Sequence, residues 1–148
     1  MSEYRVEKKE EQVCIHFSDG EIASGVVFLS EYSYVRQGGQ TVMDILEESD
    51  PFFPFRTDVG SFSLIQKAHI THIEVPPPVS VLTGEEISVE IICIGGKALK
   101  GSVLLNMPEG KNRIQDFLNS SPGFFPLLVG ETHFIANANL IREIVPVR

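Results

Sequence analysis

The sequence predicts a mainly all-β protein built from two tandem small barrels of five short strands each, with a short helical turn before the Phe-Phe-Pro strand of each barrel. The first observation is that residues 113–127 have a diverged copy at residues 41–55. In both stretches an Asp is followed by an apolar pair, polar residues and then Phe-Phe-Pro. Such self-similarity indicates an internal duplication. The second observation is that short alternating apolar segments, separated by turn residues, recur in both halves, which is typical of small all-β folds.

Composition and charge divide the chain into four parts. Residues 1–12 alternate charges without an apolar period, so we expect a flexible leader. The first barrel is expected at 13–75 and the second at 87–148, with a proline-rich linker at 76–86 that limits their separation. A unit of roughly sixty residues buries only about 60% of its unfolded surface. The two barrels are therefore expected to pack on each other or on a second chain.

Each predicted barrel begins with a hairpin. Residues 13–17 alternate apolar and polar side chains, Asp19-Gly20 supplies a tight turn, and residues 22–29 return as the partner strand. Residues 87–93, Gly95-Gly96 and residues 99–105 repeat the pattern. Gly25 and Gly101 occupy matching positions in the return strands, where we expect a bend or bulge.

A loop, the Asp element and two closing strands complete each copy. Asp116, or Asn112 before it, is expected to cap a short helical turn, and Pro122-Gly123 or Asp50-Pro51 to stop it. The closing strands are expected at 62–66 and 70–75 in the first copy, and at 133–136 and 140–145 in the second.

The order of these elements resembles the Sm-like, SH3-type small barrel. Within that class, Gly101-x-Val-x-Leu, Arg113-x-x-Asp-Phe-Leu-Asn and Phe124-Phe-Pro-Leu look like an uncharacterised bacterial domain family. The likeness covers most of residues 87–147 and, more weakly, 13–75. The resemblance implies RNA contacts through an Asp and an Asn after the second strand and an Arg-Gly pair in the last turn. This chain departs at both places: Asn106-Met-Pro-Glu-Gly follows the second strand, and Asn137-Ala-Asn or Lys67-Ala-His stands in the last turn instead of the Arg-Gly pair.

The charge distribution opposes nucleic acid binding by the first copy. The net charge of −8 is uneven, because residues 13–75 hold nine acids against three bases, whereas residues 76–148 hold seven against six. Phosphate binding needs Lys and Arg. The alternative function, a diverged Sm-like protein that binds single-stranded RNA, would therefore use the more neutral second copy. Its candidate contacts are Lys97, Asn106, Lys111, Arg113 and Asn139.

No catalytic or cofactor motif is visible, so we expect neither an enzyme nor a bound cofactor. His69 and His72 are three residues apart and face opposite sides of a strand, which disfavours a metal site with His133 or Glu74. Cys14 and Cys93 occupy inequivalent strand positions and are expected to be free. Without a signal peptide or an apolar run of about 20 residues, the chain is expected to be cytoplasmic, with no membrane contact.

These observations favour a non-enzymatic scaffold or regulatory module that contacts a protein partner and self-associates. The candidate contacts are the repeated residues Asp44, Phe52, Phe53, Asp116, Phe124 and Phe125. The structural interpretation is that each Asp caps a helical turn and each Phe pair closes its barrel. The functional interpretation is that the Asp residues line a shared groove and one Phe of each pair anchors an interface. A small-ligand sensor between the barrels is a further alternative.

Overall fold

The computed structural model describes residues 8–31, 38–77, 84–105, 113–120 and 122–147, and these form two consecutive units with the same order of elements. The first unit consists of β1 (Lys8–Phe17), β2 (Ile22–Ser30), α1 (Val42–Glu47), β3 (Phe52–Thr57), β4 (Phe62–Gln66), the 3-10 turn η1 (Lys67–His69) and β5 (Ile70–Val75). The second unit consists of β6 (Glu85–Cys93), β7 (Ala98–Leu105), α2 (Arg113–Asn119), β8 (Phe124–Val129), β9 (Thr132–Asn137), the 3-10 turn η2 (Ala138–Leu140) and β10 (Ile141–Pro146). The all-β class is confirmed.

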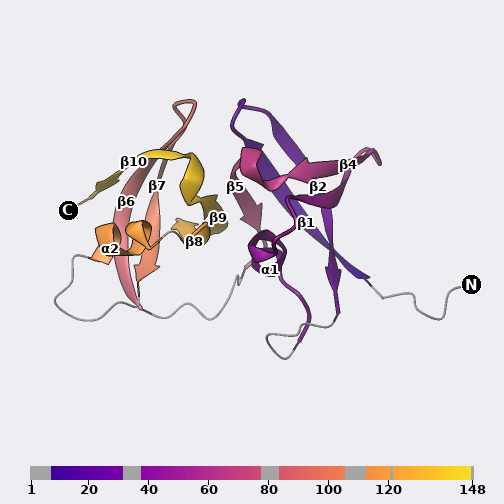
Figure 1. Ribbon diagram of the computed structural model, residues 1–148, viewed down its shortest axis with the longest axis horizontal. Coiled ribbons are helices and arrows are strands. Elements are labelled where there is room, and N and C mark those ends of the chain that lie inside the picture. Colours follow the sequence, from indigo (N-terminus) through magenta and orange to yellow (C-terminus); the bar gives the residue numbers. More distant parts are fainter. Residues whose placement is uncertain (1–7, 32–37, 78–83, 106–112, 121, 148) are drawn as a thin grey trace, which may run out of the picture.

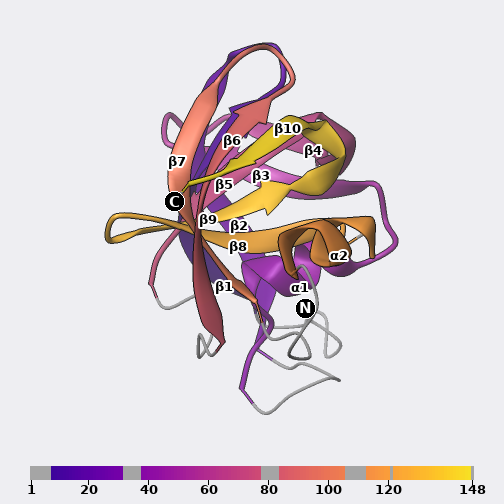
Figure 2. The same ribbon diagram turned by 90° about the vertical axis from the view of Figure 1, so that its left-hand side faces the viewer.

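All ten strands pair antiparallel in one open sheet, in the order β10-β6-β7-β8-β9-β5-β1-β2-β3-β4 (Figures 1 and 2). Each unit has its last strand beside its first, followed by the second, third and fourth. The pairings of the described residues do not close either unit into the expected barrel. The ends of the open sheet are β4 and β10.

The two units are joined through β5 and β9, which lie side by side at the centre of Figure 1. Ile73 pairs with Ile135 and Val75 with His133. At the start of β5, the buried Asn137 side chain donates a hydrogen bond of 2.8 Å from Nδ2 to the carbonyl oxygen of Ile70. The two units therefore pack on each other as one continuous sheet.

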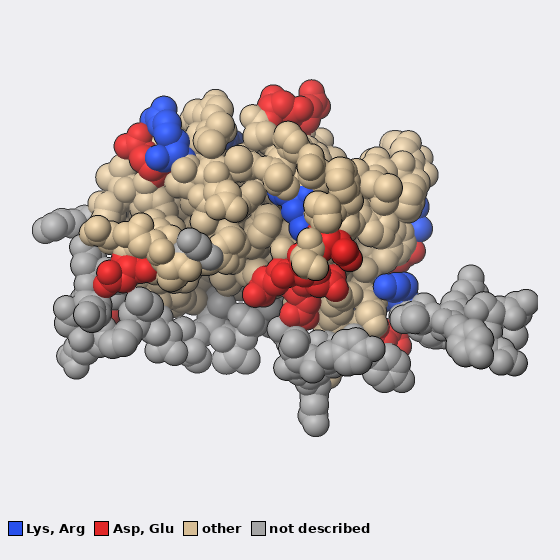
Figure 3. Space-filling view, in the orientation of Figure 1, with Lys and Arg blue, Asp and Glu red and all other residues tan. Residues whose placement is uncertain are grey.

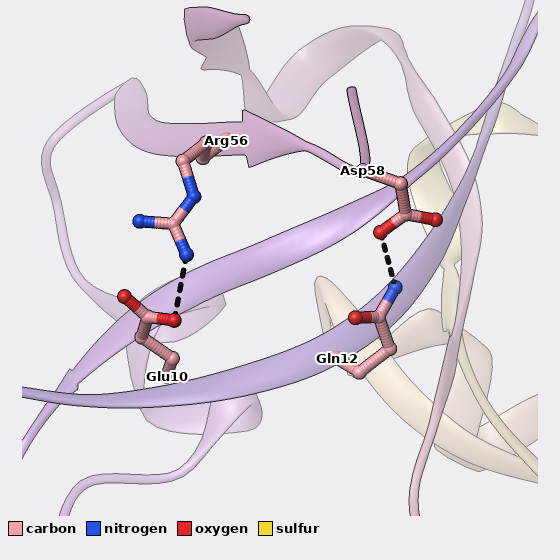
Figure 4. Close-up of polar contacts among 4 residues, drawn as sticks. All are labelled: Glu10, Gln12, Arg56 and Asp58. Atoms are coloured by element: carbon pink, nitrogen blue, oxygen red, sulfur yellow. Dashed lines mark hydrogen bonds and ion pairs between the residues drawn. The ribbon is translucent and has the colours of Figure 1, made fainter. Parts of the chain in front are cut away.

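The structure corrects two expected boundaries. Strand β1 begins at Lys8, so residues 8–12, expected in the flexible leader, pair with β2. This stretch lacks apolar alternation, and its side chains make polar contacts with β3 and the turn that follows it (Figure 4). Arg56 Nη2 lies 2.6 Å from Glu10 Oε1, and Gln12 Nε2 donates to Asp58 Oδ1 at 2.9 Å. Strand β6 begins at Glu85, inside the expected linker. Residues 1–7 and 78–83 lie outside the described part of the chain.

Each unit has its own apolar core, and the first core extends across the junction. The first cluster contains Val13, Ile15, Val27, Leu29, Val42, Ile45, Leu46, Phe53, Phe55, Ile70, Ile73, Val75 and Ile135. The second contains Val89, Ile91, Cys93, Leu99, Val103, Leu105, Phe125, Leu127, Phe134 and Ala136. Ile135 belongs to β9 and hence to the second unit, but its side chain is buried in the first core. Burial of this residue thus depends on contact between the units.

Gly25 and Gly101 allow a neighbouring strand to come close, and the strand pairing of β1 with β2 shows no bulge at Gly25. A Cβ atom at Gly25 would overlap the backbone oxygen of Arg56 on β3, and one at Gly101 would overlap that of Leu128 on β8. Neither strand pairing has a bulge at its glycine, and a close backbone approach occurs at both positions.

Among the described residues, no helix has the length and apolar character needed to cross a membrane.

We predict that Gly25→Ala and Gly101→Ala each lower the free energy of unfolding by about 1–3 kcal/mol, because an added methyl group in a closely packed site forces the backbone to shift. Urea denaturation followed by circular dichroism measures the change. Ser24→Ala, at an exposed neighbouring position in β2, serves as the matched control and should have a far smaller effect. An unchanged midpoint for both glycine variants would show that the sheet accommodates the Cβ atoms.

Candidate functional site

An exposed apolar surface covers one face of the β3–β4 hairpin at the end of the sheet. Its side chains are Phe52, Pro54, Phe62 and Leu64, which we call the hairpin face. Cross-strand pairing places them together, since Pro54 lies opposite Leu64, and directly opposed residues of antiparallel strands share a face. Phe52, Phe62 and Leu64 retain 48%, 66% and 62% of their accessible surface. Clustered exposure of this kind marks an interaction site more often than single exposed apolar residues do.

The opposite side of the hairpin supplies the core. Phe53 and Phe55 alternate with the exposed residues of β3 and are buried in the first cluster. The Phe52-Phe53 pair is therefore divided, with one ring in the core and one exposed. Phe125 is likewise buried, with its ring centroid 5.6 Å from that of Phe117 in an edge-to-face arrangement. Phe124 is half-buried and packs against the first core.

The repeated Asp residues lie in the two short helices. In α1, Asp44 and Thr41 form a capping box: the Asp44 carboxylate accepts a 2.9 Å hydrogen bond from Thr41 N, and Thr41 Oγ1 accepts one of 3.2 Å from Asp44 N. The structural role expected for Asp44 is present, although Thr41 is the N-cap residue. Asp116 is half-buried in the first turn of α2. The two Asp residues belong to separate helices, and no described contact links them.

The candidate nucleic-acid contacts do not form a described basic surface. Lys97 is exposed near the β6–β7 turn, and Asn139 is exposed in η2. Arg113 begins α2, whereas Asn106 and Lys111 lie outside the described residues. The face shown in Figure 3 is mostly neutral, and acidic side chains gather there around the position of α1.

A cavity of about 270 Å³ lies between the two units. The β1–β2 turn and β5 line it from the first unit, and Ile94, Gly95 and Lys97 line it from the second. Its charged lining residues are Asp19, Glu21 and Lys97, so both signs of charge face the same space. Lining by both units makes the cavity dependent on the junction.

His16 and His72 stack at the edge of this cavity, with ring centroids 4.1 Å apart. Thr71 Oγ1 donates to the carbonyl oxygen of His16, so it accepts a hydrogen bond from His72 Nδ1 at 2.9 Å. This assigns the proton of neutral His72 to Nδ1 and leaves a lone pair on Nε2. That nitrogen is buried without a hydrogen-bond partner among the described residues. Phe134, from the second unit, meets the His72 ring edge-to-face at 5.4 Å.

Burial keeps this histidine pair neutral. Removal from water lowers the pKa of His72 to about 3, with smaller contributions from His16 and Lys97. Burial and Lys97 also lower the pKa of His16, against an opposing effect of Glu74. The packing at the junction therefore favours the neutral form of both imidazoles.

The described residues contain no cluster of metal-ligating side chains. His69 lies exposed in η1, outside the strand, whereas His72 lies buried in β5. Cys14 and Cys93 are both free thiols, and burial raises the pKa of Cys93, which makes it a poor nucleophile.

Phe62, Leu64 and His16 were missed as candidate site residues by sequence reasoning. The strand pattern placed Leu64 on the face opposite to Ser63 and Ile65. Both faces of this strand carry apolar residues, so the pattern did not show which face is buried. The stacking of His16 on His72 depends on the pairing of β1 with β5, which no local pattern reveals.

Comparison with known proteins gives no match to a family model, to a curated protein or to a solved structure.

We predict that the protein loses stability as the pH falls from 6.5 toward 3. Because the pKa of His72 is about 3 in the folded state and 6.5 in the unfolded chain, the unfolded state binds more protons in this window. The stabilisation is complete above pH 6.5. His72→Leu should flatten the decline, as measured by urea denaturation at a series of pH values.

Phe134→Leu provides the control, because it alters packing against the same rings without removing a titratable group. It should lower stability at every pH and keep the wild-type slope. Equal slopes for wild type and His72→Leu would contradict the assigned role of His72.

Proposed function

We propose that this chain is a non-enzymatic interaction module that associates with copies of itself. Each five-strand unit would act as a small, strongly bent barrel-like body, and the pair would present binding surfaces at the ends of the sheet. The observation that carries the proposal is the hairpin face, a group of large apolar side chains exposed on β3 and on the end strand β4. Transferring a side chain of this size fully out of water contributes about 1.5–3 kcal/mol.

The strand β4 adds to this argument. An end strand presents unpaired backbone N–H and C=O groups, which makes it a template for another strand. Proteins usually protect such strands with charged residues or proline. Strand β4 contains neither, since it reads Phe-Ser-Leu-Ile-Gln. An apolar face and an unprotected edge therefore occur on the same hairpin.

We predict that Leu64→Lys weakens self-association at least tenfold, or by about 1.4 kcal/mol. The lysine would place a charge in the contact, whereas the exposure of Leu64 makes a loss of folding unexpected. Sedimentation velocity over a range of concentrations measures the effect.

Val59→Lys is the matched control, because Val59 is 90% exposed in the turn of the same hairpin and lies outside the hairpin face. It should associate like the wild type. A wild-type protein that stays monomeric at millimolar concentration would refute the proposed function.

The cavity between the units favours a second function, the sensing of a small molecule. Its lining combines the Lys97 ammonium with the carboxylates of Asp19 and Glu21, an arrangement suited to a ligand with both charges, such as a free amino acid. A ligand that contacts both units would stabilise the arrangement in which β5 and β9 are paired.

We predict that at least one of the twenty standard amino acids stabilises the fold, by about 2.7 kcal/mol when its concentration is roughly a hundred times its dissociation constant. Thermal unfolding with and without each amino acid provides the measurement. Lys97→Gln should remove the shift. A panel that leaves the melting temperature unchanged would exclude this ligand class.

A further inference from the structure

The hairpin face has a counterpart in the second unit that is covered by the first. Strands β8 and β9 occupy the places of β3 and β4, and the pair Pro126–Ile135 stands where Pro54–Leu64 stands. Ile135 is completely buried, whereas Leu64 is 62% exposed. Phe124, at the place of Phe52, packs against the first core. The same type of surface is thus covered in one unit and open in the other.

The cover is made by α1 and β5 of the first unit. Val42, Ile45 and Leu46 of α1 and Ile73 of β5 are all buried in the cluster that contains Ile135. The corresponding residues of the second unit are Ile114, Phe117 and Leu118 of α2 and Ile144 of β10. These four side chains are only half-buried. The second unit therefore carries the same apolar residues for a covering surface, with Glu143 of β10 at the place of His72, and no described residue from outside that unit fills it.

The two incomplete surfaces lie at opposite ends of the same sheet. The hairpin face includes residues of β4, which is one end strand of the sheet. The half-buried residues of α2 and β10, which we call the α2–β10 surface, lie beside β10, the other end strand. Inside the chain, a surface of the first kind and one of the second kind meet at the β5–β9 junction. The uncovered surfaces are therefore suited to meet in the same way when they belong to different copies.

We propose that a second copy of this chain occupies the hairpin face, with β4 of one copy pairing antiparallel with β10 of the next. This inference rests on the proposed function and specifies its interface. Because the two contacting surfaces differ, the association is head-to-tail, and it generates a closed ring or a filament instead of a symmetric dimer.

The internal junction also sets the register. Ile73 pairs with Ile135 and Glu74 with Phe134. The corresponding pairs between copies are Ile144 with Leu64, and Val145 with Ser63. Gln66 stands at the place of Asn137, so its amide would donate to the carbonyl oxygen of Ile141 as Asn137 donates to that of Ile70.

Disulfide trapping tests this register. In a Cys14→Ser, Cys93→Ala background, Leu64→Cys and Ile144→Cys are introduced together into the full chain. Directly opposed strand residues have Cα atoms about 4.5–5.5 Å apart, which suits a disulfide. Mild oxidation should give a ladder of linked dimers, trimers and larger species on non-reducing gels. Ser63→Cys with Val145→Cys is a second pair in the same register and avoids the half-buried Ile144.

Single-cysteine chains distinguish the head-to-tail arrangement from a symmetric one. A chain with only Leu64→Cys should not cross-link to itself, but should form dimers when mixed with a chain carrying only Ile144→Cys. Cross-linking of the Leu64→Cys chain alone would overturn the inference in favour of β4–β4 pairing. Self-association in sedimentation without cross-links from either designed pair would also overturn it, while the proposed function would stand.

Discussion

Pairing between β5 and β9 is the interaction on which the rest of the molecule depends. It merges two sets of five strands into one sheet and brings Ile135 of the second unit into the core of the first. A unit of about sixty residues has too little interior to be very stable alone. By sharing a core residue and covering the face that carries Phe124, the junction adds buried apolar contact that neither unit has alone.

The same junction contains a destabilising feature. His72 is almost completely buried, and its Nε2 atom has no hydrogen-bond partner among the described residues. An unsatisfied buried polar atom costs about 1–3 kcal/mol. Packing of both imidazoles against Phe134 offsets part of this cost. The joint is therefore stabilised mainly by apolar contact and strand pairing, and it is sensitive to protonation because an added proton on His72 Nε2 would find no acceptor among the described residues.

The local patterns predicted strands and turns well because their signals lie within a few residues. The hairpins around Gly20 and Gly96, the helical turns and the closing strands are all present close to the expected positions. Relations between distant segments could not be predicted. Lys67 illustrates this: no local pattern distinguishes it from an exposed lysine, but it is buried and donates a 2.9 Å hydrogen bond from Nζ to the carbonyl oxygen of Glu48 after α1. Comparison of the two copies identified Phe52, because the residue at the corresponding position is also a phenylalanine. It missed Leu64, because the corresponding residue is an isoleucine and the pair is not identical.

The difference in burial between corresponding residues is more informative than the repeated motif itself. If both hairpins served only their own cores, Leu64 and Ile135 would be exposed to similar degrees. Instead, Ile135 is buried because another unit covers it, and Leu64 remains apolar although nothing in the described chain covers it. An uncovered apolar residue on an end strand promotes non-specific aggregation. An apolar side chain at such a position is physically consistent with the proposed assembly, in which a second copy covers it, and the question of function then concerns the sheet that several copies would form.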